Sequence, residues 1–305
     1  MAEGSTRVVL AALAGNLGIA VVKLLAFALT RSSAMLTEAI HSLVDSGDQV
    51  LLLIGQKRAA KPPDPSHPLG YGMETYFWSF IVALMVFLLG GAVAVHQGVV
   101  KLSHPSQIER PWVSYLVLGV SAAFEGASFM TAYREYRRVV RGRDVRLWRF
   151  LRLSKDPNVF STLMEDGAAV TGLAVAALGV TGSAYLGAPW ADGAASILIG
   201  LLLVGVALFL ANESRSLIAG ESAVEPIVTA VRQILERDPR VIAVEDVLSL
   251  HLGPRAILFA AALRFRSDLS GDEVQRAALE LTRAVKRTDD RIVQVFLRPT
   301  DGVGE

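Results

Sequence analysis

The sequence predicts a membrane protein, a bundle of six transmembrane helices followed by a C-terminal α+β domain of ferredoxin-like type. Hydrophobic residues make up 52% of the 305 residues and charged residues only 19%, against roughly 45–50% and about 25% in an average soluble domain. Six windows approach the roughly 20 apolar residues that cross the hydrocarbon core of a bilayer. After residue 212 the charge returns to the density of a soluble domain. We therefore expect a transmembrane domain over residues 1–212 and a separate domain over residues 213–305.

The predicted spans differ in how purely apolar they are. The third, fourth and sixth windows are apolar over most of their length, whereas the second and fifth contain several ionisable residues. Glycine is frequent in the windows, as it is in membrane helices that pack closely. The windows cover residues 7–29, 34–56, 77–99, 113–133, 159–181 and 190–211.

The C-terminal segment alternates between helical and strand periodicity. AVEPIVTAVRQILERD and DEVQRAALELTRAVKR carry apolar residues at helical spacing. VEDVLSLHLGPRAILFAAALRF reads as two strands joined at Gly253 and Pro254, a pair typical of turns, and RIVQVFLRP reads as a closing strand. The order helix, strand, strand, helix, strand predicts a ferredoxin-like domain.

Basic residues in the loops predict the orientation of the bundle. The loops at 57–76 and 134–158 hold three and nine Lys or Arg residues, and the loops at 30–33, 100–112 and 182–189 hold three in all. Basic loops stay on the cytoplasmic side. An even number of spans then places both termini and the C-terminal domain in the cytoplasm, in a multi-pass protein of the cell (inner) membrane. The arginine-rich loop is also suited to contact with anionic lipids of the bilayer.

Composition excludes several functions. With 30 basic and 29 acidic residues, nothing indicates a nucleic-acid partner. The absence of cysteine excludes disulfides, thiolate catalysis and cysteine-ligated zinc or iron–sulfur sites. Any bound metal must be held by His, Asp, Glu or backbone oxygen atoms.

Ionisable residues cluster on one face of the second window. Glu38, His41, Asp45 and Asp48 are spaced three, four and three apart, which is one side of a helix. His41 and Asp45 can direct one nitrogen and one or two oxygens at the same point, and such ligands suit zinc and related ions. The alternative is a polar helix interface, and this is the favoured interpretation for Glu38 and Asp48, near the membrane surface or in an aqueous vestibule.

The fourth and fifth windows carry three further carboxylates. Glu165 and Asp166 are adjacent, so their side chains diverge by about 100° around the helix. One of them could complete a tetrahedral site with His41 and Asp45, and the other could be an acceptor behind the ligands or a charge near a helix N-terminus. Glu125 lies alone in mid-window, where it is protonated, paired with Lys23, or part of an ion path.

Two polar positions have a structural alternative. Asp64 and His67 lie in the proline-rich loop KPPDPSHPLGYGMET, where they could bind metal or simply belong to a rigid connector. Asp192 lies at the start of the sixth window and is expected to cap the helix of that window.

Together these features resemble the cation diffusion facilitator family. The resemblance rests on six spans, HSLVD in the second span, DPSHPLGYG after it, acidic residues in the fifth span and the VEDV…LGP hairpin. It extends from about residue 8 to 299. The details are most similar to the branch containing mitochondrial zinc transporters, in which the loop also reads DPSHP-G and the fifth span also carries ED.

The resemblance implies a metal site in the middle of the membrane, formed by two residues four apart on the second span and two on the fifth. Carried over, His41, Asp45 and Asp166 match three of these positions. The fourth position is Thr162, whose hydroxyl is a poor zinc ligand, so Glu165 is expected to replace it and Glu125 is the reserve. The resemblance also implies a loop site near Asp64 and His67 and a homodimer.

The predicted function is a secondary active transporter, not an enzyme. It would export Zn²⁺, or Mn²⁺, Fe²⁺, Co²⁺ or Cd²⁺, from the cytoplasm in exchange for protons, with no prosthetic group. Metal binding needs a neutral His41 and ionised carboxylates, so it displaces protons. Two alternatives stay open: a metal-binding sensor or scaffold without transport, and an intramembrane metallohydrolase, which would need three ligands, an open position and a general base.

Overall fold

The computed structural model describes residues 3–105, 108, 110–140, 147, 150 and 155–301. The chain forms two compact units. One comprises Met1–Gly55 and Trp78–Ser214, and the other comprises Gln56–Phe77 and Arg215–Glu305. The second unit thus combines the C-terminal residues with the proline-rich loop, which lies far from them in the sequence. In the arginine-rich loop, residues 141–146, 148, 149 and 151–154 lie outside the described residues.

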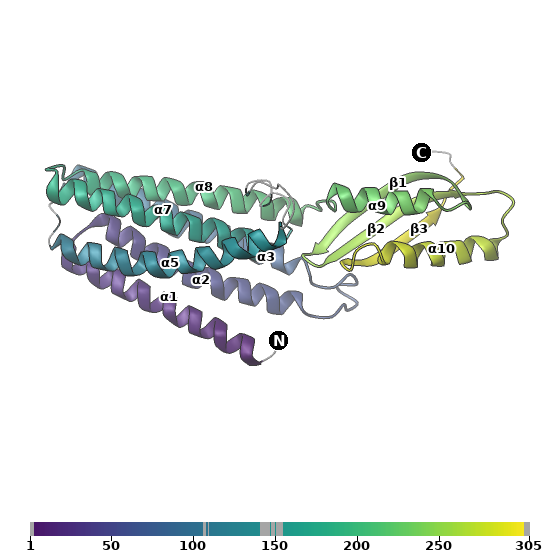
Figure 1. Cartoon of the computed structure of the whole chain (residues 1–305), viewed down its shortest axis with the longest axis horizontal. Coiled ribbons are helices and arrows are strands. Elements are labelled where there is room, and N and C mark those ends of the chain that lie inside the picture. The colour runs from purple at the N-terminus through teal and green to yellow at the C-terminus, as the bar shows by residue number, and fades with distance from the viewer. Residues whose placement is uncertain are drawn as a thin grey trace. The chain divides into compact units, whose positions relative to one another are not determined.

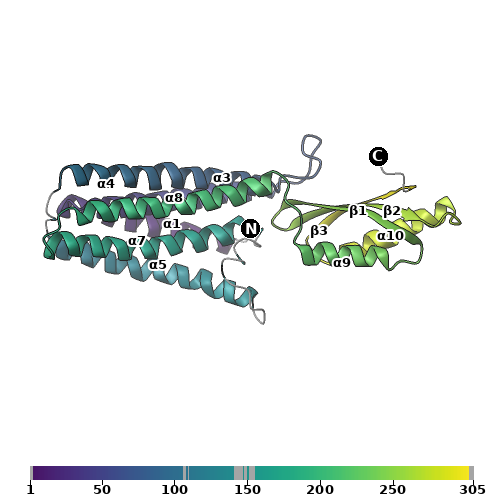
Figure 2. The ribbon, with the colours of Figure 1, turned by 90° about the horizontal axis from the view of Figure 1, so that it is seen from above.

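The first unit is built from long helices that run side by side (Figures 1 and 2). A helix forms in each of the six apolar windows, and α5 packs against both α1 and α7. The elements are α1 (Glu3–Thr30), α2 (Ser33–Ala59), α3 (Glu74–Met85), the π-helix η1 (Val86–Ala92), α4 (Val93–Ser103), α5 (Pro111–Val139), α7 (Pro157–Tyr185) and α8 (Ala191–Ile218).

The outer surface of this unit is apolar. Leu25, Leu88, Leu178 and Leu208 are each more than half exposed, which is unusual for large apolar side chains in a contiguous surface facing water and ordinary in lipid. Four helices of the described chain are long and apolar enough to cross a membrane: Glu74–Ser103, Pro111–Arg138, Val159–Tyr185 and Ala191–Ile218. The structure therefore shows a membrane-type helical region, and six spans remain a proposal.

Glycines allow the first and last of these four helices, Glu74–Ser103 and Ala191–Ile218, to approach closely. Gly91 and Gly98 face Gly193 and Gly200, with a spacing of seven residues on each side. A Cβ atom on Gly200 would lie 2.9 Å from the carbonyl oxygen of Gly91, and one on Gly98 would lie 2.7 Å from that of Gly193. Small residues at such positions are a common means of packing helices in lipid.

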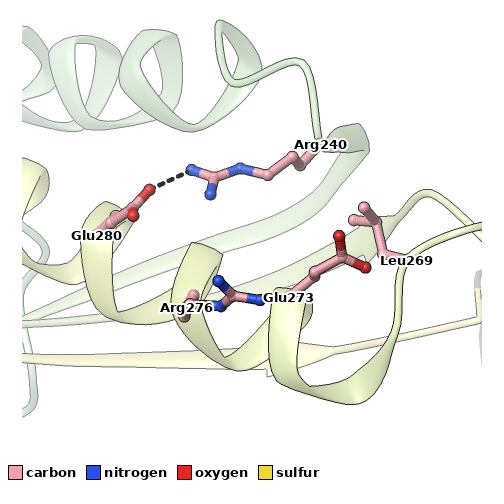
Figure 3. A pocket seen from close by; sticks show the side chains of 5 residues that line it. All are labelled: Arg240, Leu269, Glu273, Arg276 and Glu280. Atoms are coloured by element: carbon pink, nitrogen blue, oxygen red, sulfur yellow. Dashed lines mark hydrogen bonds and ion pairs between the residues drawn. The ribbon is translucent and has the colours of Figure 1, made fainter.

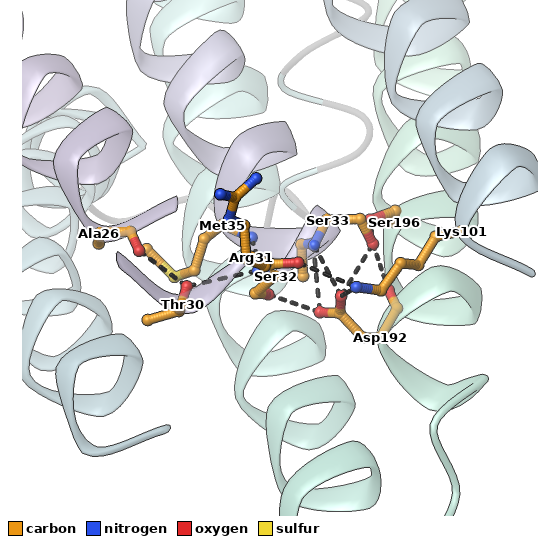
Figure 4. A network of polar contacts seen from close by, with 10 residues as sticks. Ala26, Thr30, Arg31, Ser32, Ser33, Met35, Lys101, Asp192 and Ser196 are labelled. Atoms are coloured by element: carbon orange, nitrogen blue, oxygen red, sulfur yellow. Dashed lines mark hydrogen bonds and ion pairs between the residues drawn. The ribbon is translucent and has the colours of Figure 1, made fainter. Parts of the chain in front are cut away.

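Asp192 joins the start of α8 to the start of α2 (Figure 4). Its buried carboxylate accepts hydrogen bonds from the backbone amide of Ser33 at 2.6 Å and from the hydroxyl of Ser32 at 2.5 Å. Lys101 Nζ lies 3.8 Å from the same carboxylate and donates to the carbonyl oxygen of Arg31 at 2.9 Å. The expectation that Asp192 caps its own helix was wrong, because its carboxylate satisfies the free amides of α2 instead.

The second unit contains a small mixed sheet. Strand β1 pairs with β2 in antiparallel fashion and β2 with β3 in parallel, in the order β1-β2-β3. The predicted turn at Gly253 and Pro254 is confirmed, as is the order of elements. These are α9 (Glu225–Glu236), β1 (Val241–Gly253), β2 (Ala256–Phe265), α10 (Gly271–Lys286) and β3 (Ile292–Pro299).

Both helices of this unit pack on the same face of the sheet (Figure 2). Val231 and Leu235 of α9 and Leu281 of α10 meet Phe259 and Leu263 of β2 in one apolar core. Ser270 and Glu273 begin α10 with a reciprocal capping box, which satisfies two otherwise free amides. The opposite face of the sheet is left without a covering helix among the described residues.

The proline-rich loop packs against this domain through a glycine. A Cβ atom on Gly72 would lie 2.2 Å from the carbonyl oxygen of Leu252, a distance that no side chain can occupy. The loop and residues 215–305 therefore lie on the same side of any membrane. The chain between them must cross an even number of times, in agreement with the four apolar helices that it contains.

Candidate functional site

A cavity of 350 Å³ opens among α1, α2, α5 and α7. Carboxylates from three different helices line it. Placing several carboxylates inside an apolar bundle costs free energy, so such a cluster indicates a candidate functional site. The lining residues are Asn16, Asp45, Gln49, Leu52, Phe124, Glu125, Ser128, Thr162, Glu165 and Asp166. Four of the sequence-predicted residues, Asp45, Glu125, Glu165 and Asp166, thus meet here although three helices supply them.

His41 and Asp45 lie together on α2, as their spacing predicted. The Nδ1 atom of His41 is 3.4 Å from Oδ1 of Asp45. Neither ring nitrogen of the buried His41, nor Oδ1 of Asp45, has a hydrogen-bond partner among the described residues. Buried polar atoms without partners are costly, so this pair is a candidate for binding a ligand. Asp45 reaches the cavity, and His41 lies one turn behind it.

Both acidic residues of α7 reach the cavity although they are neighbours in the sequence. Asp166 accepts a hydrogen bond from the hydroxyl of Ser128 on α5 at 2.7 Å. Glu165 has one buried carboxylate oxygen that lacks a hydrogen bond within the described part of the chain. Asp166 is therefore oriented by α5, whereas Glu165 is the less constrained of the two.

Glu125 is paired with a buried lysine, one of the three alternatives that the sequence left open. Lys23 Nζ lies 3.9 Å from Glu125, 3.2 Å from Glu38 and 2.7 Å from the hydroxyl oxygen of Ser42. Glu38 and Asp48 are almost completely buried. Both acids thus lie between packed helices, and the pairing of Glu38 with Lys23 of α1 agrees with the polar helix interface favoured from the sequence.

Sequence reasoning missed two polar residues of the cavity wall. Gln49 follows Asp45 by four residues, so the same spacing that linked His41 to Asp45 would have found it. Ser128 follows Glu125 by three residues on α5, and its role as the partner of Asp166 depends on helix packing. Thr162 does line the cavity, which agrees with its place in the family motif.

The ligand atoms surround the cavity without converging on one point. Within the described residues, no group of three or more His, Asp or Glu side chains is close enough to hold a metal ion. Oxygen atoms dominate the wall and one imidazole stands behind it, a donor set that suits divalent ions from magnesium and manganese to zinc. An ion that binds here must draw the side chains inward.

Comparison with known proteins identifies the family. The model of the cation efflux transmembrane domain matches residues 9–219. The chain belongs to the cation diffusion facilitator family. This confirms the resemblance inferred from HSLVD and DPSHPLGYG, and it places the chain in a family of transporters.

The alignments with similar proteins cover most of this chain. Proton-coupled zinc antiporter SLC30A9, mitochondrial, of Xenopus laevis is 34% identical over 278 residues, which are 91% of this chain and 49% of that protein. Metal tolerance protein C4 of Arabidopsis thaliana is 31% identical over 238 residues, covering 78% and 52%. Magnetosome protein MamM of Magnetospirillum gryphiswaldense is 27% identical over 214 residues, covering 67% and 60%. The chain spans about half the length of the first two of these relatives.

The proline-rich loop of the facilitator is held by one carboxylate. Asp64 accepts hydrogen bonds from the hydroxyls of Ser66 at 2.6 Å and Tyr71 at 2.6 Å, and from the backbone amide of His67 at 2.8 Å. The ring of His67 stacks on Tyr71 with 4.0 Å between centroids. The hydrogen bonds, that from the Ser66 hydroxyl first, hold the pKa of Asp64 far below its usual range. Both oxygens of Asp64 are thus engaged in fixing the turn.

A second hollow of 230 Å³ lies on the surface of the C-terminal unit (Figure 3). Its charged residues already have partners within the domain. Arg240 donates to Glu280 at 2.7 Å, Glu273 belongs to the cap of α10, and Arg276 donates to a backbone oxygen. These side chains stabilise the fold, and the hollow is not assigned a ligand.

The hydrogen bonds of Asp64 predict a graded pKa response. Replacing Ser66 by Ala should raise the pKa of Asp64 toward its usual value, and Tyr71→Phe should raise it less, because the Ser66 bond is the larger cause. Since the folded pKa is depressed, order in the loop is present at neutral pH and lost as the pH falls through that pKa. Carboxyl carbon NMR titration of the chain in detergent measures this. Equal titration of Asp64 in all three proteins would contradict the role of these bonds.

Proposed function

We propose that the chain is a secondary transporter that exports a divalent cation, Zn²⁺ first, from the cytoplasm in exchange for protons. The observation that carries the proposal is the cavity walled by carboxylates from α2, α5 and α7 inside an apolar bundle, in a chain of the cation efflux family. Two of the relatives are named for zinc antiport or metal tolerance, which supports metal as the cargo. No feature of the described residues favours an enzyme or a non-transporting sensor.

The proposed ligands of the transported ion are His41, Asp45, Glu165 and Asp166. The first two are adjacent and have unpartnered atoms, and the last two enter the same cavity from α7. One nitrogen and several carboxylate oxygens suit Zn²⁺ and also admit Mn²⁺, Fe²⁺, Co²⁺ and Cd²⁺. Because the ligands are spread around the wall, the site is assembled by the ion as it binds.

Proton exchange follows from the chemistry of these ligands. An ion can be bound only by neutral imidazole and ionised carboxylate groups, so its arrival releases protons. When the ion leaves, protons can compensate the negative charges that remain in the bundle. Alternate loading by metal and protons on either side, as helices rock around a fixed site, is antiport.

The proposed topology has six spans with both termini in the cytoplasm. The proline-rich loop and the C-terminal unit share one side of the membrane, and the basic residues of that loop favour the cytoplasmic side. α1 and α2 would then form the remaining pair of spans. Lys23 of α1 and Glu38 of α2 are buried in the bundle, where they pair with each other.

In this topology Asp64 and His67 form a rigid cytoplasmic connector. The carboxylate of Asp64 is occupied by hydrogen bonds, and the His67 side chain stacks on Tyr71 and lies 2.9 Å from the Ser66 hydroxyl oxygen. A metal would have to displace these contacts. The connector role is therefore proposed in preference to a second metal site.

The proposed assembly is a homodimer in which the uncovered face of the sheet meets a second copy. Ile242 and Leu248 on β1 and Phe296 on β3 are each more than half exposed. They alternate with residues that pack into the helix-covered core, so they lie on the opposite face. Exposed apolar patches of this kind mark interaction surfaces.

The site assignment predicts loss of transport in Asp45→Asn. The substitution removes a ligand charge from the cavity while preserving the size of the side chain, so zinc-driven proton flux in proteoliposomes should fall to background. Asp272→Asn, which changes an exposed residue of α10, is the matched control and should transport like the unmodified chain. Full flux in Asp45→Asn would overturn the assignment.

The place of Thr162 at the cavity wall leads to a prediction about which ion is preferred. Thr162→His adds a nitrogen ligand at the cavity wall, so the variant should shift competition fluxes toward Zn²⁺ and away from Mn²⁺, which prefers oxygen. Thr171→His alters an exposed threonine on the same helix and should leave the preference unchanged. If the two variants behave alike, Thr162 does not approach the transported ion.

The dimer surface makes a separate prediction. Leu248→Asp places a charge on the uncovered sheet face and should reduce the dimer fraction measured by light scattering in detergent. Leu279→Asp, a change at an exposed residue on the helix side, should not. A chain that is monomeric without either substitution would refute the homodimer.

A further inference from the structure

We propose that Lys23 determines the ion specificity of the transport site. Its ammonium group acts as a built-in cation that engages Glu38 and Glu125 and thereby keeps these two carboxylates out of the coordination shell of the transported ion. The inference rests on the proposed function and assigns a role to a residue of α1, a helix that contributes no ligand to the proposed site.

The contacts of Lys23 place its charge directly beside the cavity. The side chain is completely buried, with Nζ 3.2 Å from Glu38 Oε2 and 2.7 Å from Ser42 Oγ. Glu125 Oε1 lies 3.9 Å away, at ion-pair distance but without a hydrogen bond. Glu125 also lines the cavity. It therefore stands between the ammonium group and the space that the ion would enter.

Two different bonds fix the ammonium group in this place. Glu38 and Ser42 are four residues apart on α2, one on each side of His41 in sequence, and both hold Lys23. Three protons on the nitrogen point in tetrahedral directions, and two of them are used by α2. On α5, Glu125 Oε1 lies within ion-pair distance of the same nitrogen, at 3.9 Å.

The physical consequence concerns the number of oxygens that an ion meets. With Lys23 present, a cation in the cavity meets His41, Asp45, Glu165 and Asp166, a set that includes nitrogen and suits zinc. Without Lys23, Glu125 is released and adds a fourth acid side chain to an oxygen-rich wall. Harder ions that accept more oxygen ligands, such as Mn²⁺, would gain relative to Zn²⁺.

The role differs from that of an ordinary buried ion pair. Removing one partner of a buried pair destabilises a protein whatever its function, and Lys101 offers the matched case. Lys101 is also buried in the bundle and lies 3.8 Å from Asp192. Its partner Asp192 does not line the cavity, whereas Glu125, a partner of Lys23, does. A stability effect is expected at both lysines, and a change in ion preference only at Lys23.

The experiment measures Zn²⁺ and Mn²⁺ fluxes in competition, in proteoliposomes containing the chain or its variants. The ratio of the two fluxes is independent of how much protein inserts. In Lys23→Met the ratio should shift toward Mn²⁺ by roughly tenfold. The free energy that corresponds to this factor is smaller than the interaction energy of two unit charges near 4 Å at a protein's effective dielectric constant. Lys23→Arg keeps the charge and should keep the ratio, as should Lys101→Met.

Two further variants separate the mechanism from misfolding. Lys23→Met combined with Glu125→Gln removes the released charge and should return the ratio to that of the unmodified chain. In Lys23→Met combined with Glu38→Gln, the buried carboxylate of α2 that would lose its lysine is neutralised as well, so the fold should be less destabilised than in Lys23→Met alone. This double variant should still show the shift of the flux ratio toward Mn²⁺. Its failure to do so overturns the inference.

The remaining outcomes are also decisive. An unchanged ratio in Lys23→Met, or an equal shift in Lys101→Met, would reduce Lys23 to a structural residue while leaving the transport function intact. If the unmodified chain moves no divalent ion, the proposed function fails and the inference falls with it.

Discussion

The cost of placing charge in hydrocarbon is the constraint on which the rest of this structure depends. A charged side chain in a membrane span must face the interior, find a partner or face a polar cavity. Lys23 and Glu38 are completely buried and paired, and Asp166 bonds to Ser128. The leucines occupy the outer surface instead. The cavity is the one place among the described spans where several carboxylates gather, so it is also where a cation gains most from binding.

The helices and the first pair of site residues could be predicted because they depend on local sequence. A helix forms in every predicted window, since length and apolar composition decide it. The distance between His41 and Asp45 follows from a spacing of four on any helix. The order of helices and strands along the C-terminal domain was equally accessible, because Gly253 and Pro254 mark its hairpin turn. For these elements, neighbours in the chain determine neighbours in space.

Contacts between helices could not be predicted in the same way. Asp192 caps α2 and not the helix that it begins, and Glu38 turns inward to Lys23. Both outcomes depend on how α1, α2 and α8 are packed, which periodicity along one helix does not encode. The sequence could state that Glu125 needs a partner and could name Lys23 among the alternatives. Only the packed bundle brings the two within 3.9 Å.

The spread of ligands around the cavity is what a transported ion requires. A closed structural zinc site binds with about 10–16 kcal/mol of apparent free energy, and an ion held that tightly would leave too slowly to be cargo. If the proposed residues bind the ion, part of the binding energy must be used to draw in side chains that lie apart around the cavity. Such a site would lose affinity whenever helix movement separated α2 from α7. Asp45 is on one of these helices and Glu165 and Asp166 are on the other, so under the proposed function rocking between them would both assemble the site and release the ion.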